Sequence, residues 1–232
     1  MARPQDRVWL FDLDNTLHNA SAFAFGAIDA AMTAYIEREL GVDRTEANRL
    51  RAHYWRRYGA TLLGLVRHHG VKPGHFLHHT HALPELERRL HSHPHDVAAL
   101  RRLPGRKFVL TNAPLAYTER VLRALGLAAC FDGVIAVEHM AMFGQLRPKP
   151  DARMLRAVLV KLRAQPHASV LVEDTLAHQK AAHRIGMRTV WMQRWLHHAT
   201  QGHGPEAGAV LRRRPAYVCA RIRSLQPLLR LL

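Results

Sequence analysis

The fold is decided by residues 8–17, which read Val8-Trp9-Leu10-Phe11-Asp12-Leu13-Asp14-Asn15-Thr16-Leu17. An apolar run followed by polar turn residues is typical of a buried strand that ends in a loop. Residues two apart on a strand share a face, so we expect Asp12 and Asp14 to project together beyond the end of this strand. Two neighbouring carboxylates repel each other and predict a cation beside them, for which Mg²⁺ is the natural candidate. The alternative is a polar turn in which Asp14, Asn15 and Thr16 cap the next helix.

The composition is that of an ordinary globular protein. The chain has 232 residues, a length that suits one main domain with a substantial insertion, and its 48% of hydrophobic residues argues against intrinsic disorder. The formal net charge of +16 comes almost entirely from arginine. Because the arginines are scattered and no zinc-finger spacing or basic heptad region occurs, the charge predicts a solvated surface that attracts small anions, and we do not expect a nucleic-acid partner.

The small number of cysteines and the short apolar runs bear on where in the cell the protein is expected. Cys130 and Cys219 are the only cysteines, they lie far apart, and no secretory leader precedes the first predicted strand. We therefore expect a cytoplasmic protein with free thiols, present as a monomer or homodimer. No apolar run approaches the roughly 18 residues of a membrane span, so no membrane partner is expected.

The residues after the first strand show helical periodicity. Apolar spacing, a capping-box pattern at Asp43 and helix-ending glycines predict helices over 21–40, 43–58, 61–69 and 84–90, with a looser segment around 72–74. We expect these helices to form an all-helical domain, residues 18–95, inserted after the first strand.

From Asp96 onward, helices and strands alternate. The pattern predicts helices over 96–103, 115–125, 151–163 and 175–185, and strands over 107–110, 133–137, 169–172, 189–192 and 216–219. Residues 197–208 are expected to form a loop. Such alternation predicts an α/β fold, with a Rossmann-like parallel sheet covered by helices on both faces and formed by residues 1–17 and 96–232. Ligands bind such sheets beyond the carboxyl ends of the strands.

Polar clusters fall at four places along that expected edge of the sheet. They are Asp12/Asp14/Thr16, Thr111/Asn112, Lys149 and Glu173/Asp174. Each cluster alone also fits a turn, a surface lysine or a helix N-terminus. Together and in this order, over residues 8 to about 192, they resemble the four motifs of the haloacid dehalogenase-like hydrolase superfamily. The sequence departs from that pattern at His178, where many relatives carry Asp or Asn.

The resemblance implies a Mg²⁺-dependent phosphomonoester hydrolase that acts through an aspartyl-phosphate. Asp12 is then the nucleophile, and Asp14 protonates the leaving oxygen and later deprotonates water. An acid at the second position favours a phosphatase, because dehalogenase members lack it. Lys149 is expected to neutralise charge on Asp12 and on the phosphoryl group. The implied phosphate-binding residues are Thr16, Thr111, Lys149 and, through its backbone amide, Asn112. The implied metal ligands are Asp12, the Asp14 carbonyl and Asp174, with Glu173 either a direct ligand or a residue that supports one.

The predicted helical insertion resembles the cap of this superfamily, which covers the active site and selects the leaving group. Residues 53–59, His-Tyr-Trp-Arg-Arg-Tyr-Gly, resemble the pyrimidine 5′-nucleotidase branch, together with residues 11–18 and 110–112. This resemblance implies nucleoside 5′-monophosphate substrates with a pyrimidine preference, and Tyr54, Arg57 and Tyr58 are candidate contacts to base or ribose.

Three alternatives stay open at this point. The aromatic residues of that segment have the helical spacing of packing residues. The second alternative is that the substrate is a small organic phosphate such as phosphoglycolate or a sugar phosphate. The third alternative is that the chain is not an enzyme but a basic protein that binds anions or nucleic acid.

Overall fold

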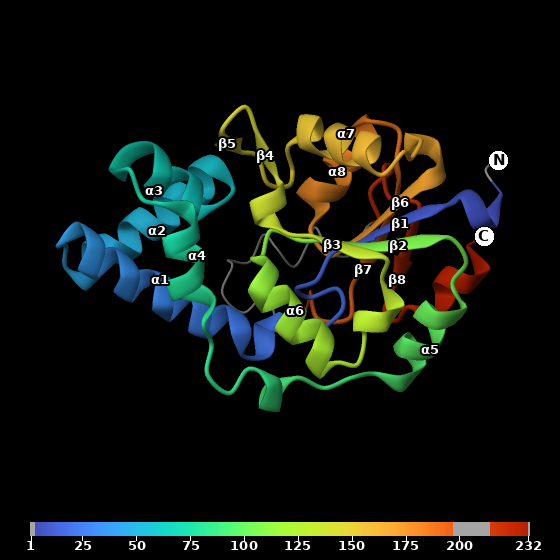
Figure 1. Cartoon of the computed structure of the whole chain (residues 1–232), viewed down its shortest axis with the longest axis horizontal. Helices are drawn as coiled ribbons and strands as arrows, with labels where there is room; N and C mark the ends of the chain where they lie inside the picture. Colours follow the sequence, from blue (N-terminus) through green and yellow to red (C-terminus); the bar gives the residue numbers. More distant parts are fainter. Residues whose placement is uncertain (1–2, 197–213, 232) are drawn as a thin grey trace. The chain divides into compact units, whose positions relative to one another are not determined.

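The computed structural model describes residues 3–196 and 214–231 (Figure 1). The chain divides into two compact units, a core unit of Met1–Ser21 with Leu90–Leu232 and a helical unit of Ala22–Arg89. The loop predicted over residues 197–208 lies outside the described residues. Within the described part of the chain, no helix has the length and apolar character that crossing a membrane requires.

The core unit is built on a six-stranded parallel sheet with the strand order β3-β2-β1-β6-β7-β8. Its strands are β1 (Val8–Phe11), β2 (Arg106–Leu110), β3 (Gly133–Ile135), β6 (Ser169–Glu173), β7 (Arg188–Met192) and β8 (Ala220–Ile222). β1 lies between β2 and β6, with Phe11 beside Val109 and Val172. The carboxyl ends of these three strands therefore meet at one edge of the sheet.

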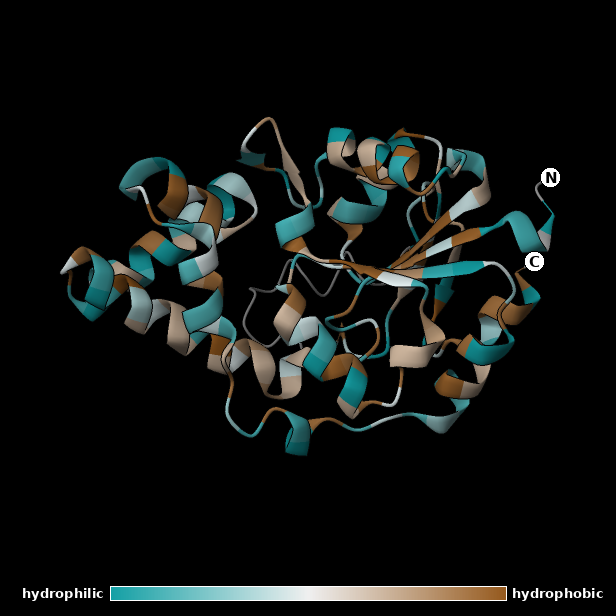
Figure 2. Cartoon of the chain, in the orientation of Figure 1, coloured by the Kyte–Doolittle hydropathy of each residue, from teal (hydrophilic) through white to brown (hydrophobic). Residues whose placement is uncertain are grey.

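Helices cover both faces of this sheet, which confirms the predicted Rossmann-like α/β architecture (Figure 1). The helices are α5 (Pro94–Arg102), α6 (Leu115–Ala124), α7 (Ala152–Lys161) and α8 (Leu176–Arg184). α7 and α8 lie on one face, and α5 and α6 lie on the other. Hydrophobic residues run through the central strands (Figure 2), as expected for strands that are buried on both sides.

β1 is buried along its whole length. Val8 and Leu10 join the hydrophobic cluster of α7 and α8. On the opposite face, the indole N–H of Trp9 donates to the carbonyl of Pro104 at 2.9 Å, and Phe11 packs edge-on against Phe131. Because both faces of β1 are fixed by packing, the chain delivers Asp12 to the sheet edge in a defined orientation.

The helical unit consists of α1 (Ala24–Leu40), α2 (Arg44–Tyr58), α3 (Thr61–His69) and α4 (Pro73–His81). Asp43 caps α2, because its carboxylate accepts a hydrogen bond from the amide of Glu46 at 2.8 Å. α2 and α3 pack closely because Gly64 has no side chain, and a Cβ there would overlap the ring of Tyr54.

Several elements differ from the sequence prediction. α4 occupies the segment expected to be loose, because Phe76, Leu77 and Thr80 are buried even though histidines interrupt the apolar pattern. Residues 84–90 contain only a 3-10 turn at Glu87–Arg89. The last strand is Ala220–Ile222 and not 216–219, since pairing with β7 sets its position. A hairpin of β4 (Ala141–Met142) and β5 (Gln145–Leu146) was not predicted.

Asp151 begins α7 directly after Lys149 and Pro150. Its side chain accepts hydrogen bonds from the amides of Arg153 and Met154, at 2.8 and 3.4 Å. Partial burial opposes ionisation, but the side-chain and backbone hydrogen bonds of Arg153 outweigh it and lower the pKa of Asp151 to about 2.

We predict that Asp151→Ala lowers the free energy of unfolding by about 1 kcal/mol at neutral pH, and Asp151→Asn by less, since Asn also caps helices. A lowered pKa contributes stability above the unfolded-state value near 4 and loses it as the pH falls toward about 2. Urea unfolding from pH 7 to pH 2 should therefore show the difference between wild type and Asp151→Ala shrinking below about pH 4. A constant difference would contradict the assignment.

Candidate active site

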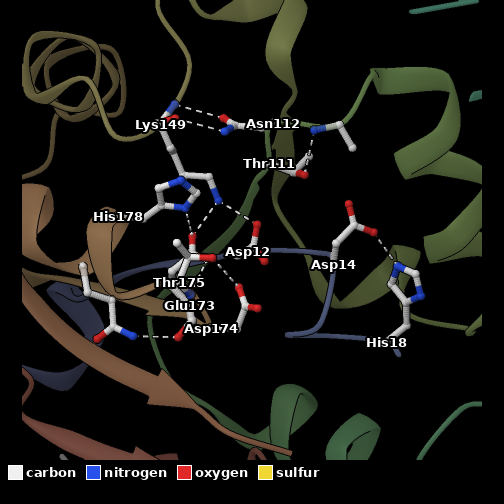
Figure 3. Close-up of polar contacts among 12 residues, drawn as sticks. Asp12, Asp14, His18, Thr111, Asn112, Lys149, Glu173, Asp174, Thr175 and His178 are labelled. Carbon is white, nitrogen blue, oxygen red and sulfur yellow. Dashed lines mark hydrogen bonds and ion pairs between the residues drawn. The ribbon is translucent and has the colours of Figure 1, made fainter. Parts of the chain in front are cut away.

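Carboxylates from two neighbouring strands meet at the carboxyl edge of the sheet, around one lysine (Figure 3). The ammonium of Lys149 donates to Asp12 Oδ1 at 2.6 Å and to Glu173 Oε2 at 2.7 Å. Asp174 follows Glu173, and oxygens of Asp12, Glu173 and Asp174 lie within 4.8 Å of one another. The structure thus brings together four residues that the sequence analysis placed at this edge.

Lys149 is fixed by its backbone as well as by its ammonium group. The Asn112 side chain accepts from the amide of Lys149 at 2.9 Å and donates to its carbonyl at 3.0 Å. Asn112 was predicted to bind phosphate, and in the structure both polar atoms of its side chain are used to hold Lys149. The Lys149–Pro150 peptide bond is cis.

The two acids at the end of β6 are held by three side chains, of which Gln179 and Trp191 were not singled out from the sequence. Gln179 of α8 is fully buried and donates to the carbonyl of Glu173 at 2.7 Å. The indole of Trp191 in β7 donates to the carbonyl of Asp174 at 2.8 Å. His178 lies 3.1 Å from Glu173 Oε2 and forms an ion pair with it when protonated. A glutamine one turn into the predicted helix after an acidic pair is the sequence signal that could have indicated the contact of Gln179.

The cluster has more carboxylates than cations, and its pKa values reflect this. Burial raises the pKa of Asp12 to about 7, with Glu173 adding to the rise and Lys149 opposing it. Burial, Glu173 and Asp12 together raise the pKa of Asp174 well above its usual value. Burial also opposes ionisation of Glu173, but Lys149 and His178 outweigh it and hold that pKa below its usual value. Burial alone would lower the pKa of Lys149, but Asp12 and Glu173 raise it.

These residues fit a magnesium ion. Three carboxylates are donors of the kind that Mg²⁺ prefers, and their oxygens are close enough to share one ion. One ammonium group faces three carboxylates, and burial together with the neighbouring carboxylates raises the pKa values of Asp12 and Asp174. A second cation would oppose that rise.

The polar groups predicted to hold phosphate lie at the ends of β1 and β2. Thr111 Oγ1 accepts from the amide of Ala113 at 3.0 Å, which leaves its hydroxyl proton to donate elsewhere. Thr16 is buried, and among the described residues its hydroxyl has no partner. Asp14 Oδ1 accepts from Tyr117 at 2.9 Å and lies 2.8 Å from His18 Nε2.

The three residues predicted to contact substrate lie on α2 of the helical unit. Tyr54 is buried, packs on Gly64 and bonds His69 Nε2 through its hydroxyl at 2.7 Å. Tyr58 is half-buried and its hydroxyl lies 2.6 Å from His68 Nε2, while Arg57 is exposed. Tyr54 therefore has the packing role that its helical spacing also allowed, and Arg57 and Tyr58 are the more accessible of the three.

Comparisons with known proteins agree with this geometry. The family model for haloacid dehalogenase-like hydrolases matches residues 7–186, and the chain belongs to that family. Phosphate metabolism protein 8 of Saccharomyces cerevisiae is 23% identical over 194 residues, which cover 79% of this chain but only 60% of the yeast protein.

Solved structures show the same fold. A haloacid dehalogenase-family phosphatase of Thermococcus onnurineus matches with a TM-score of 0.62 and 20% identity over 97% of both chains. L-2-haloacid dehalogenase of Xanthobacter autotrophicus matches with a TM-score of 0.57 and 17% identity, again over 97% of both chains. At these identities the likeness establishes the fold, and the chemistry has to be argued from the residues of this chain.

We predict that Mg²⁺ stabilises the protein against heat more strongly at pH 8 than at pH 5.5. The pKa of Asp12 is raised to about 7, so the metal-free native state becomes less stable as the pH rises from about 4 to 7 and Asp12 has to ionise. Mg²⁺ binds the ionised carboxylate and therefore stabilises the protein most at the higher pH. At Mg²⁺ concentrations roughly 10 to 100 times the dissociation constant of the Mg²⁺ complex, we expect the Tm at pH 8 to rise by about 3–10 °C.

The matched variants for this measurement are Asp174→Asn and Asp6→Asn. Asp174→Asn removes one carboxylate of the cluster and should abolish most of the rise in Tm. Asp6→Asn removes an exposed carboxylate that is paired with Arg3 and should leave the rise intact. An equal response of both variants would place the ion elsewhere.

Proposed function

We propose that this protein is a Mg²⁺-dependent phosphomonoester hydrolase that acts through an aspartyl-phosphate. The observation that carries the proposal is Asp12, a buried carboxylate at the end of β1 whose Oδ1 is held 2.6 Å from the Lys149 ammonium. That contact leaves Oδ2 of Asp12 to attack phosphorus. Asp14 stands two residues further on and supplies the acid that such a reaction needs.

The residues of the site have separate roles in this reaction. Asp12 forms the new P–O bond while the ester P–O bond breaks, and Asp14 gives a proton to the leaving oxygen. Water then attacks phosphorus, Asp14 takes a proton from it, and the Asp12 carboxylate is restored as inorganic phosphate forms. Lys149 neutralises negative charge on Asp12 and on the phosphoryl oxygens. Bound Mg²⁺ supplies further charge neutralisation at the phosphoryl group.

The metal and phosphate roles follow from the contacts around each residue. Glu173 uses both carboxylate oxygens in bonds to Lys149 and to the Thr175 amide, so we assign it a supporting position beside Asp12 and Asp174. The Asp14 backbone carbonyl is the further metal ligand that the family resemblance implies. Thr16 and Thr111 bind phosphate oxygens through their hydroxyls. Asn112 contributes its backbone amide, because its side chain is engaged with Lys149.

For the substrate, we propose a nucleoside 5′-monophosphate with a pyrimidine preference, selected by residues 18–95 acting as a cap. The exposed Arg57 and half-buried Tyr58 support this choice. The buried Tyr54 favours the second candidate, a small organic phosphate such as phosphoglycolate or a sugar phosphate, because it offers no free ring for a base. We further propose a cytoplasmic location, which the free thiols of Cys130 and Cys219 favour, and a monomer or homodimer as the oligomeric state.

The decisive experiment measures phosphate release from 4-nitrophenyl phosphate with and without Mg²⁺. We expect Mg²⁺-dependent turnover by the wild type and loss of at least about a thousandfold in Asp12→Asn, since no other carboxylate stands in its place. Asp132→Asn, which removes a carboxylate bonded to the Lys107 amide, is the control for a general loss of fold. Wild type as inactive as Asp12→Asn would favour the non-catalytic, anion-binding alternative.

A panel of phosphate esters tests the proposed preference for pyrimidine nucleotides. Values of kcat/KM for UMP, CMP, AMP, GMP, phosphoglycolate and a sugar phosphate should be highest for the two pyrimidine nucleotides. Arg57→Ala should raise KM for UMP and leave KM for phosphoglycolate unchanged. A preference for a non-nucleotide would transfer the assignment to the small-phosphate alternative.

A separate prediction concerns the support of Lys149. Asn112→Ala removes both side-chain hydrogen bonds to the Lys149 backbone, and we expect kcat to fall by about tenfold, the effect of roughly 1.4 kcal/mol. Gln145→Ala removes a single exposed hydrogen bond to Arg147 in the same connection and should leave kcat unchanged. Equal kinetics for Asn112→Ala and wild type would show that Lys149 keeps its place without Asn112.

A further inference from the structure

Two buried side chains converge on one oxygen of Asp14. His18 Nε2 lies 2.8 Å from Asp14 Oδ1, and the hydroxyl of Tyr117 donates to the same oxygen at 2.9 Å. The two partners also lie 3.4 Å apart, so the three groups form a closed cluster. His18 comes from the loop after β1 and Tyr117 from α6, 103 positions from Asp14.

The partners are much more buried than the carboxylate that they hold. The side chain of His18 is 1% exposed and that of Asp14 is 18% exposed, while Tyr117 is 1% exposed. His18 Nε2 faces a carboxylate oxygen, which only accepts hydrogen bonds when ionised, so we assign the ring proton of His18 to Nε2. Nδ1 of His18 is buried and has no partner among the described residues. The hydroxyl of Tyr117 is the donor in its contact with Asp14, because an ionised carboxylate only accepts hydrogen bonds.

The second carboxylate oxygen of Asp14, Oδ2, is the one available for proton transfer. Among the described residues, none forms a hydrogen bond or ion pair with Oδ2, and in the close-up Oδ2 points away from His18 (Figure 3). A proton on Oδ1 would face the hydrogens of two donors, so the proton of the acid form belongs on Oδ2. The two donors therefore decide which oxygen of Asp14 exchanges protons, and they fix its direction.

The backbone of the loop supports this arrangement. The amide of Leu17 donates to the carbonyl of Leu13 at 2.8 Å, which closes a tight turn between Asp14 and His18. Asn15 has the left-handed backbone conformation, with φ 57°. Its side chain exchanges two hydrogen bonds with Ser21, at 2.8 and 3.1 Å. The turn thus carries His18 back to the carboxylate four residues before it.

We propose that His18 and Tyr117 are positioning residues for the general acid, which hold Asp14 Oδ1 so that Oδ2 delivers the proton to the leaving oxygen. This inference rests on the proposed phosphatase function and adds two residues that the four sequence motifs do not include. In the first step the ester P–O bond breaks, its electron pair stays on the leaving oxygen, and the proton of Asp14 Oδ2 joins it. In the second step water returns a proton to the same oxygen.

The test compares esters whose leaving groups need the acid to different degrees. For phenyl, 4-nitrophenyl and 2,4-dinitrophenyl phosphate, kcat/KM reports the step in which the leaving group departs. Tyr117→Phe and His18→Leu should lower kcat/KM by about tenfold or more for phenyl phosphate and by about twofold or less for the dinitrophenyl ester, because a weakly basic leaving oxygen needs little protonation. His18→Gln, which restores a donor near the position of Nε2, should recover part of the loss.

Tyr35→Phe is the matched control. It removes another buried tyrosine hydroxyl bonded to a histidine, 2.8 Å from His75 Nδ1 in the helical unit, and should leave the dependence on leaving group unchanged. Thermal unfolding of each variant shows that it is folded. Losses of equal size for the three esters, or no loss, would overturn the positioning role while the phosphatase assignment stands. Absence of Asp12-dependent hydrolysis in the wild type would overturn the proposed function itself, and this inference with it.

Discussion

The ion pairs of Lys149 are the contacts on which the rest of the site depends. A buried ammonium lies 2.6 Å from Asp12 and 2.7 Å from Glu173, and so joins the carboxyl ends of β1 and β6. Removing either partner from such a cluster would leave a buried charge without compensation, which costs far more than a surface ion pair is worth. The surrounding contacts serve this arrangement, since Asn112 holds the lysine backbone and Gln179 and Trp191 hold the backbone carbonyls of the two acids.

The site contains more carboxylates than cations, and this imbalance sets the pKa values of its acids. Three acids that are buried together raise the pKa values of Asp12 and Asp174, so the site favours a second cation. Asp14 stands apart from this group, because its partners are the hydroxyl of Tyr117 and the imidazole of His18. Two carboxylates that lie two residues apart in sequence thus have different surroundings, which suits one to be a nucleophile and the other to be an acid and base.

Most of the core unit was predictable from the sequence. Local periodicity placed the strands that begin near Val8, Arg106 and Ser169, because buried parallel strands read as short apolar runs. The same patterns missed α4, where histidines mask a buried face, and misplaced β8, whose position depends on pairing with β7. For the candidate site, the sequence indicated Asp12, Lys149 and Asp174, but it gave no sign that the side chain of Asn112 holds the backbone of Lys149.

What the sequence determined by itself was the order of polar residues at strand ends, because each strand is specified by neighbours within a few residues. Only the tertiary structure decided which side chains support them. Tyr117 reaches Asp14 across 103 positions, and Lys149 reaches Asp12 across 137. Such contacts follow from the packing of helices on a twisted sheet, and local sequence patterns carry no information about that packing.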